Sequence, residues 1–176
     1  MATTNVSKKR TITLYKQAVH YDIDALTYKL TESTMQAADQ KAKSSVASDR
    51  NDAFDASVLA RLTDYRDATL RRRLLFCLSE EECESFNNKP DTNETYVYDL
   101  VVPGGFRDVS LKTIGVKMHE YLVKGGLLDW YIQTGVNLNT NPLAEQVAAL
   151  ESEIVSMLRV PSSLKKPLQP FGPAGV

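Results

Sequence analysis

The residue types that most often carry catalysis are scarce in this sequence. Its two histidines, His20 and His119, lie far apart in the chain, and neither has a cysteine beside it. A zinc site needs clustered ligands, and a catalytic nucleophile needs a base that is oriented by a third group. A single helical histidine, such as His119 before Glu120, is more often a packing or surface residue. We therefore predict a protein that is not an enzyme, with no catalytic centre, metal site, cofactor or small-molecule substrate.

The cysteines and glycines also favour structural roles. Cys77 lies in an apolar run and Cys83 in an acidic stretch, a usage typical of reduced intracellular thiols. The sequence Pro-Gly-Gly-Phe at 103–106 lacks the lysine and hydroxyl residue of a phosphate-binding loop, so we expect a turn there. Gly125 and Gly126 interrupt a helical pattern at some cost in helix propensity, and we expect them to allow close helix packing.

Three consecutive arginines, Arg71, Arg72 and Arg73, form the sharpest charge feature. Consecutive positions spread around a helix, so these side chains cannot form one flat surface for phosphates. We expect a solvated face with one or two ion pairs to acidic residues, for example the glutamates at 80–84. Contact with nucleic acid is the alternative, and the sequence leaves open whether these arginines meet DNA or acidic side chains.

The 176-residue chain has an ordinary composition, with 43% hydrophobic and 24% charged residues. This size suits one domain, and a formal net charge of −1 argues against a general nucleic-acid binder. The charge is nevertheless uneven, because residues 1–18 and the end of the chain are basic while residues 79–94 are acidic. We find no signal peptide and no apolar run of membrane-spanning length, so we expect no contact with a membrane.

Two short segments have the pattern of strands. In residues 10–16, Ile12 and Leu14 alternate with polar residues, and residues 96–103 form a second such run that ends at a proline. Each segment is too short to be stable alone. We therefore predict one small sheet in which residues 10–16 pair with residues 96–102.

Two helices are expected between these strands. The first starts at Asp22, a capping residue, and its apolar stripe is Ile23, Leu26 and Leu30. A small, polar stretch at 41–51 follows, which we expect to be a loop or a frayed connection. The second helix starts at Asn51 or Asp52. We expect its apolar stripe at Phe54, Val58, Leu62, Tyr65 and Thr69, continued on a shifted line by Leu70, Leu74 and Cys77.

Two more helices follow the second strand. The third, capped by Asp108, has one apolar face formed by Leu111, Ile114, Met118, Tyr121, Leu122, Leu128 and Ile132, and a second formed by Val116, Val123, Leu127 and Trp130. A helix that is apolar on two sides is central in its domain or shared with a neighbour, so we expect Val123, Leu127 and Trp130 to bind a partner. The fourth starts at Asn141, before a favourable proline, and runs until Pro161 through Leu143, Val147, Leu150, Ile154 and Met157.

The end of the chain has a different composition. Residues 161–176, PSSLKKPLQPFGPAGV, contain four prolines and no acidic residue, so they suit neither a helix nor a central strand. Ordering such a segment requires buried surface from a partner. We predict a mainly α fold, a four-helix bundle with a small two-stranded β element at 1–160 and an extended arm at 161–176. The arm would contact partners through Leu164, Lys165, Lys166, Leu168 and Phe171.

Four segments carry a resemblance to a known group of proteins. They are TITLYK near the start, HEYLVKGGLLDWYI at 119–132, EQVAALESEIVSML at 145–158 and LKKPLQPFG in the tail. Their order resembles the small virion proteins of the head–tail connector, or neck, of tailed bacteriophages. The resemblance covers the first strand and roughly residues 96–172, whereas residues 31–51 depart from it.

This resemblance implies a structural protein, a ring-forming adaptor in the virion that is assembled in the bacterial host cytoplasm. Its partners would be copies of itself, the portal and other neck and tail proteins, with weak contact to packaged DNA. From the residues alone, a small helical regulatory or nucleic-acid-binding module is the alternative, because the basic ends and the arginine run suit phosphates. Such a module should bind duplex DNA at low salt as a monomer or dimer.

Overall fold

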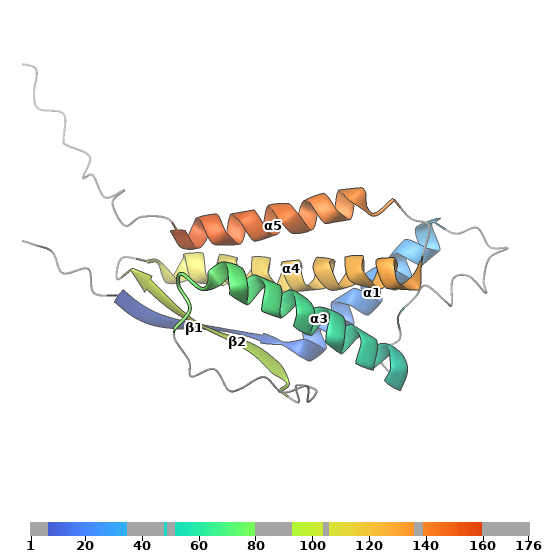
Figure 1. The fold of residues 1–176 in the computed structure, drawn as a ribbon, viewed down its shortest axis with the longest axis horizontal. Coiled ribbons are helices and arrows are strands. Elements are labelled where there is room, and N and C mark those ends of the chain that lie inside the picture. The colour runs from blue at the N-terminus through green and yellow to red at the C-terminus, as the bar shows by residue number, and fades with distance from the viewer. Residues whose placement is uncertain are drawn as a thin grey trace, which may run out of the picture.

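The computed structural model describes residues 7–34, 48, 52–79, 93–103, 106–135 and 139–159. In these residues the chain is mainly helical and has one two-stranded antiparallel sheet (Figure 1), which confirms the predicted class. The elements in chain order are β1 (Ser7–Tyr15), α1 (Lys16–Thr34), α3 (Ala53–Leu74), β2 (Thr95–Pro103), α4 (Asp108–Thr134) and α5 (Asn141–Arg159).

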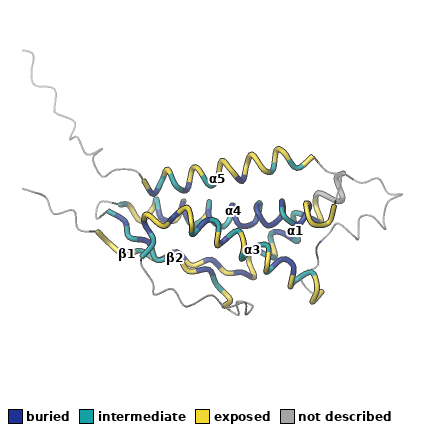
Figure 2. Tube along the Cα trace, in the orientation of Figure 1, coloured by how far each residue is buried: buried dark blue, intermediate teal, exposed yellow. Residues whose placement is uncertain are grey.

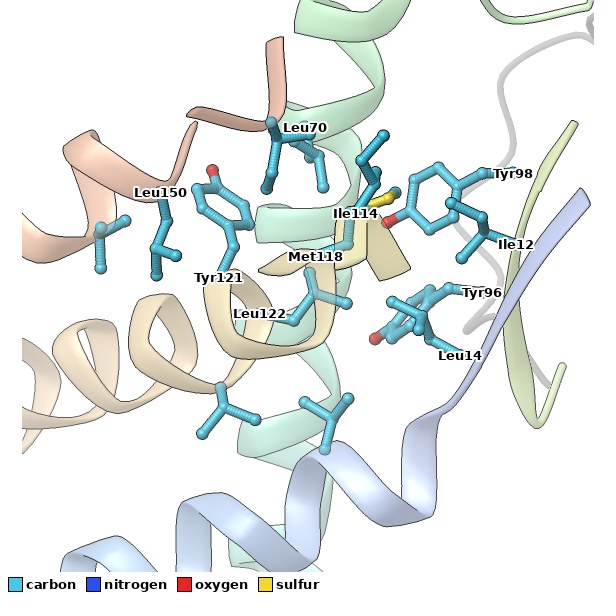
Figure 3. Packing of buried hydrophobic residues seen from close by; sticks show 14 of the residues in the cluster. Ile12, Leu14, Leu70, Tyr96, Tyr98, Ile114, Met118, Tyr121, Leu122 and Leu150 are labelled. Carbon is cyan, nitrogen blue, oxygen red and sulfur yellow. The ribbon is translucent and has the colours of Figure 1, made fainter. Parts of the chain in front are cut away.

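The sheet pairs β1 with β2, as predicted. Ile12 lies opposite Tyr98, and Leu14 lies opposite Tyr96. All four side chains are buried, and Figure 3 shows them on the side of the strands that faces the helices. The sheet therefore covers one side of the core with alternate residues of both strands, while the residues between them face outward.

A short segment after α3 lines the other edge of β2. The Val101 N–H group donates to the Cys77 carbonyl oxygen at 2.6 Å, and the Ser79 N–H group donates to the Asp99 carbonyl oxygen at 2.7 Å. Cys77 is buried, and burial raises the pKa of its thiol to about 11. This thiol therefore stays protonated and unreactive at neutral pH.

The central helix is α4, which packs against α1, α3 and α5 and also contacts β1 (Figures 1 and 2). Most of its predicted first face is buried, namely Leu111, Ile114, Met118, Tyr121, Leu122 and Leu128. Ile132 was expected in this set but is 65% exposed. Trp130 and Tyr131 occupy the buried positions near the end of the helix instead.

Gly125 and Gly126 bring α4 close to its neighbours, as predicted. A methyl group on Gly126 would lie 2.8 Å from Ile23 Cδ1 of α1 and 3.1 Å from Thr63 Cγ2 of α3. A methyl group on Gly125 would lie 2.9 Å from Arg66 Cδ of α3. The two glycines therefore make room for side chains of both neighbouring helices.

Two helices start where the sequence predicts. The Asp52 carboxylate caps α3 by accepting hydrogen bonds from the N–H groups of Phe54 and Asp55, at 2.8 and 3.1 Å. Such a bond satisfies backbone groups that have no partner within the helix. α5 begins at Asn141.

The other two predicted helix starts need correction. α1 begins at Lys16, directly after β1, so Asp22 lies inside the helix and does not cap it. Asp108 is the first residue of α4, and the capping position belongs to Arg107, which has no side-chain capping bond. The Asp108 carboxylate instead accepts from Arg10 Nε of β1 at 3.1 Å.

The first part of the stripe predicted for α3 is partly wrong. Phe54 and Tyr65 are 74% and 64% exposed. The buried positions are Val58, Leu59, Thr63, Asp67, Leu70 and Leu74. Thr63 and Asp67 were missed because they are polar, and they are buried because they bind tyrosine hydroxyl groups from β2. The shifted line of Leu70, Leu74 and Cys77 is confirmed.

Several predicted features lie outside the described residues. They are the loop at 41–51 except for Ser48, the glutamates at 80–84, and the tail at 161–176 with Leu164, Lys165, Lys166, Leu168 and Phe171. Among the helices that are described, none combines the length and apolar character needed to cross a bilayer.

Candidate functional site

Buried polar groups connect β2 to α3. Tyr96 and Tyr98 are 3% and 0% exposed, and Figure 3 shows their hydroxyl groups directed away from the strands. The Tyr98 hydroxyl donates to the Asp67 carboxylate. The Tyr96 hydroxyl donates to Asp64 Oδ1 at 2.8 Å and lies 2.9 Å from Thr63 Oγ1.

Each of these carboxylates also binds a cation. Arg71 Nε donates to Asp67 Oδ2 at 2.7 Å, and its guanidinium group lies 4.6 Å from the centre of the Tyr98 ring. Lys16 Nζ donates to Asp64 Oδ1 at 2.9 Å and lies 4.8 Å from the centre of the Tyr96 ring. The same group of tyrosine, aspartate and cation therefore occurs twice. We call these two groups the tyrosine seam.

The hydroxyl groups of the tyrosine seam hold β2 against α3 by hydrogen bonds and keep their protons at neutral pH. Burial, and then the nearby carboxylates, raise the pKa of Tyr96 and Tyr98 far above the usual value of 10.0. The hydroxyl groups therefore stay protonated and act as hydrogen-bond donors. Each cation neutralises its aspartate and stacks on a ring, so the seam joins the sheet to α3.

The two histidines have different partners. His20 Nε2 lies 3.1 Å from Thr63 Oγ1, beside the tyrosine seam. His119 Nε2 lies 2.8 Å from Asp22 Oδ2. The sequence did not predict the contact between His119 and Asp22, because Asp22 was expected to cap α1 and instead lies within it. The described residues contain no group of three or more histidine, cysteine or acidic residues that could hold a metal ion.

The arginine run forms ion pairs, as expected, but with helical partners. Arg71 binds Asp67 within α3, and Arg73 Nε lies 2.6 Å from Glu151 Oε1 of α5. Arg72 is exposed. Two of the three arginines are therefore engaged in holding the fold together.

A second arginine contact joins α3 to the central helix. Arg66 Nε and Nη2 donate to the two oxygens of Asp129 at 2.7 and 2.6 Å. The aliphatic part of Arg66 lies against Gly125, so this glycine makes room for the bidentate ion pair. Such pairs are among the stronger polar contacts in proteins.

A surface groove of about 530 Å³ is lined by residues of α4 and α5. Its two charged lining residues, Lys117 and Glu153, bind each other. The groove therefore offers no unpaired charge from its lining to hold an ionic ligand.

The predicted partner-binding residues of α4 need correction. Val123, Leu127 and Trp130 are 5%, 2% and 4% exposed. They belong to the core of the chain itself because α4 is surrounded by three helices and the sheet, so they do not form a free surface. Val116, from the same predicted face, is 67% exposed.

Apolar side chains are exposed at other positions. Phe54 and Tyr65 lie on α3, and Val109 and Val116 lie on α4 with 74% and 67% of their surface exposed. Eleven and seven residues are close to whole numbers of helical turns, so each pair lies on one side of its helix. This spacing is readable in the sequence, but it was interpreted there as a core pattern on α3.

Comparisons with known proteins give no relative. No family model, no curated protein and no solved structure matches this chain.

Proposed function

We propose that this chain is a structural virion protein of a tailed phage, a ring-forming adaptor without enzymatic activity at the head–tail connection. The observation that carries the proposal is the exposed apolar surface that remains after the core is complete. Phe54 and Tyr65 on α3 and Val109 and Val116 on α4 are each more than 60% exposed. Large exposed apolar patches mark surfaces that bind other proteins, and in this proposal the four residues belong to such a surface.

The segments that resemble neck proteins support the same proposal. HEYLVKGGLLDWYI belongs to α4 and EQVAALESEIVSML belongs to α5, and these two helices pack against each other. In this proposal the four helices act as one rigid bundle. The resemblance then covers two helices that pack together rather than two unrelated sequence segments.

We also propose that residues 161–176 act as an arm that binds a neighbour. The start of β1 and the end of α5 lie at the same end of the molecule (Figure 1). Lys8 and Lys9 near the start of β1 are exposed, and the arm carries Lys165 and Lys166. An acidic surface of the portal, of another neck protein or of a second copy would suit this basic end, and packaged DNA would contact it weakly.

The location of the chain in purified particles tests the proposal. We expect mass spectrometry to detect it in intact virions and labelled antibodies to place it at the head–tail junction in electron micrographs. A double variant, Phe54→Ser with Tyr65→Ser, should fold but enter particles less efficiently. Ala68→Ser, at another exposed position of α3, is the matched control and should enter particles normally.

Two results would contradict the proposal. One is absence of the chain from particles that are otherwise complete. The other is tight binding of duplex DNA by an isolated monomer or dimer, with affinity that falls steeply as salt increases, because that behaviour belongs to the regulatory alternative.

A further inference from the structure

The two edges of the sheet differ. Along β2, one edge pairs with β1 and the other accepts and donates hydrogen bonds with residues 77–79. Along β1, only the edge that faces β2 is paired by the described residues. We call the outer edge of β1, which the described residues leave unpaired, the open edge. Such an edge on a nine-residue strand is a template for another extended segment.

The direction of the backbone groups identifies which residues form this open edge. Hydrogen-bonding directions alternate along a strand. The Lys16 N–H group points to Glu94 on the β2 side, at 2.9 Å. Because the direction changes from each residue to the next, the N–H and carbonyl groups of Lys9, Thr11 and Thr13 point away from β2.

The open edge is basic. Lys8 and Lys9 are exposed, whereas Arg10 is partly neutralised by Asp108 at 3.1 Å. β1 contains no proline, so each backbone group on the edge can bond. An acidic extended segment would match both the backbone groups and the charge.

An acidic sequence follows directly after the residues that bond to the far edge of β2. Ser79 is bonded to the far edge of β2 through Asp99, and the acidic sequence EEECESF follows at once as residues 80–86. The thirteen residues from 80 to 92 separate Ser79 from Asn93. Half of such a length spans roughly 20 Å when extended.

We propose that the open edge of β1 accepts residues 80–86 of a second copy as an added strand. The donor segment follows Ser79, which bonds to the far edge of β2, whereas the acceptor is the outer edge of β1, so each copy can use both at the same time. A contact between two different surfaces repeats from copy to copy and closes into a ring if the rotation allows. The inference rests on the proposed function, because it names the contact between subunits of the adaptor ring.

The charge disfavours the alternative in which β1 pairs with β1 of another copy. That arrangement would bring two basic segments with Lys8 and Lys9 close together. It would also use the same edge twice and would therefore stop at a dimer.

Cross-linking between defined positions tests the contact. Cys83 lies in the donor segment, and Cys77 is buried and protonated. We would replace Thr13, which is exposed on the edge strand, by cysteine and add a short thiol–thiol cross-linker to the full chain. The expected result is a ladder of covalent dimers, trimers and larger species that disappears when Cys83→Ser is added. High salt should weaken the ladder.

The control is Ala148→Cys, at an exposed position on α5 that is part of neither the sheet nor the exposed apolar surface. It should give only the pattern of the unmodified chain. The proposal is overturned if Thr13→Cys gives no more cross-linking than this control. It is also overturned if dimers form through Thr13→Cys when Cys83 has been replaced, because that result means that β1 pairs with itself.

A peptide provides a second measurement on the unmodified chain. A fluorescent peptide with the sequence of residues 79–88, with serine in place of Cys83, should bind the full chain. Thr13→Pro removes an N–H group that points outward, at an edge position where proline is tolerated, and should weaken binding at least tenfold. Thr13→Val keeps this N–H group and should bind normally. Equal binding to both variants would overturn the proposal.

The two hypotheses can fail separately. A chain that is found at the neck but gives no ladder keeps the proposed function and loses this contact. A chain that gives the ladder but is absent from particles keeps the contact and loses the neck role.

Discussion

At the scale of single residues, the fold depends on polar groups that are buried and satisfied. Tyr98 is fully buried, and its hydroxyl donates to Asp67, which also accepts from Arg71. An unpaired polar group in this position would carry the full cost of its lost hydration. In the tyrosine seam, each tyrosine hydroxyl and each cation therefore satisfies the aspartate that they share.

Removing one hydroxyl group tests this view. Tyr98→Phe takes away the donor and leaves the Asp67 oxygen short of a hydrogen bond, so the free energy of unfolding should fall by about 1–3 kcal/mol. Chemical denaturation measures this change. Tyr15→Phe is the control, since Tyr15 is 64% exposed, and it should change stability by less than about 0.5 kcal/mol. Similar values for the two variants would show that the buried bond contributes little.

His20 gives the stability a dependence on pH. Burial lowers its pKa below the usual value of 6.5, and Lys16 adds to this effect, although Asp24 and Asp64 oppose it. The unfolded chain therefore binds more protons at His20 than the folded chain once the pH falls below about 6.5, and stability decreases as the pH falls through that range.

The replacement His20→Gln should remove this contribution. Denaturation of both proteins at several pH values between 5 and 7.5 measures it, and all other titratable groups are the same in the two chains. We expect the difference in unfolding free energy between them to change with pH in favour of the original chain at higher pH. A difference that stays constant over the range contradicts the assignment.

At the scale of elements, α4 determines how closely the other helices approach. Its Gly126 faces Ile23 of α1 and Thr63 of α3 at distances that leave no room for a methyl group. Its Gly115 has more space, with Ile12 Cγ2 at 3.6 Å from the position of an added methyl carbon. The two glycines therefore have opposite expected responses to substitution.

Gly126→Ala should destabilise the protein. Overpacking a close contact costs about 1–3 kcal/mol, which exceeds the gain of about 1 kcal/mol in helix propensity. Gly115→Ala makes an ordinary contact, so it should be neutral or stabilise by up to about 1 kcal/mol. Thermal melting of both variants measures the effects. If Gly126→Ala melts at or above the original temperature, the helices have room to move apart.

Leu122 is fully buried on the core side of α4, and its replacement provides a second test of this packing. Leu122→Ala should reduce the free energy of unfolding by about 2–5 kcal/mol, because it leaves a cavity among the packed helices. Val116→Ala on the exposed side of the same helix should cost less than about 0.5 kcal/mol. A loss below roughly 1 kcal/mol for Leu122→Ala would mean that the core collapses around the smaller side chain.

At the scale of the whole molecule, the described residues share one core. β1, β2 and the helices bury one continuous cluster of apolar side chains (Figures 2 and 3). Ordering residues 161–176 costs on the order of 1–2 kcal/mol per residue for the backbone. Four prolines reduce this cost by restricting the free chain. The tail has few large apolar groups to balance the remainder, so we expect a partner to supply the pockets.

Deleting residues 162–176 tests the arm. The helical signal in circular dichroism and the melting temperature of the isolated chain should stay nearly unchanged, while incorporation into particles should fall. Replacing Leu168 and Phe171 by serine in the full-length chain should reproduce the loss, whereas replacing Ser162 and Ser163 by alanine should not. If the deletion unfolds the isolated chain, the tail is part of the core and the arm hypothesis is wrong.

The sequence by itself determined the features that depend on local chemistry. The alternation around Ile12 predicted the strand, the capping side chain of Asp52 predicted the start of α3, and Asn141 before a proline predicted the start of α5. The glycines of α4 predicted close packing. These signals are readable because each arises from the backbone or from neighbours a few residues away.

Only the tertiary structure decided which polar side chains are buried and which apolar side chains are left exposed. Thr63 and Asp67 face the core because β2 brings two tyrosine hydroxyl groups to them, and Phe54 and Tyr65 are exposed as a result. Trp130 is buried in its own chain because α4 is surrounded by three helices and a sheet. A polar residue can be buried when a partner satisfies it, and that partner can be more than thirty residues away in the chain, where no local pattern records it.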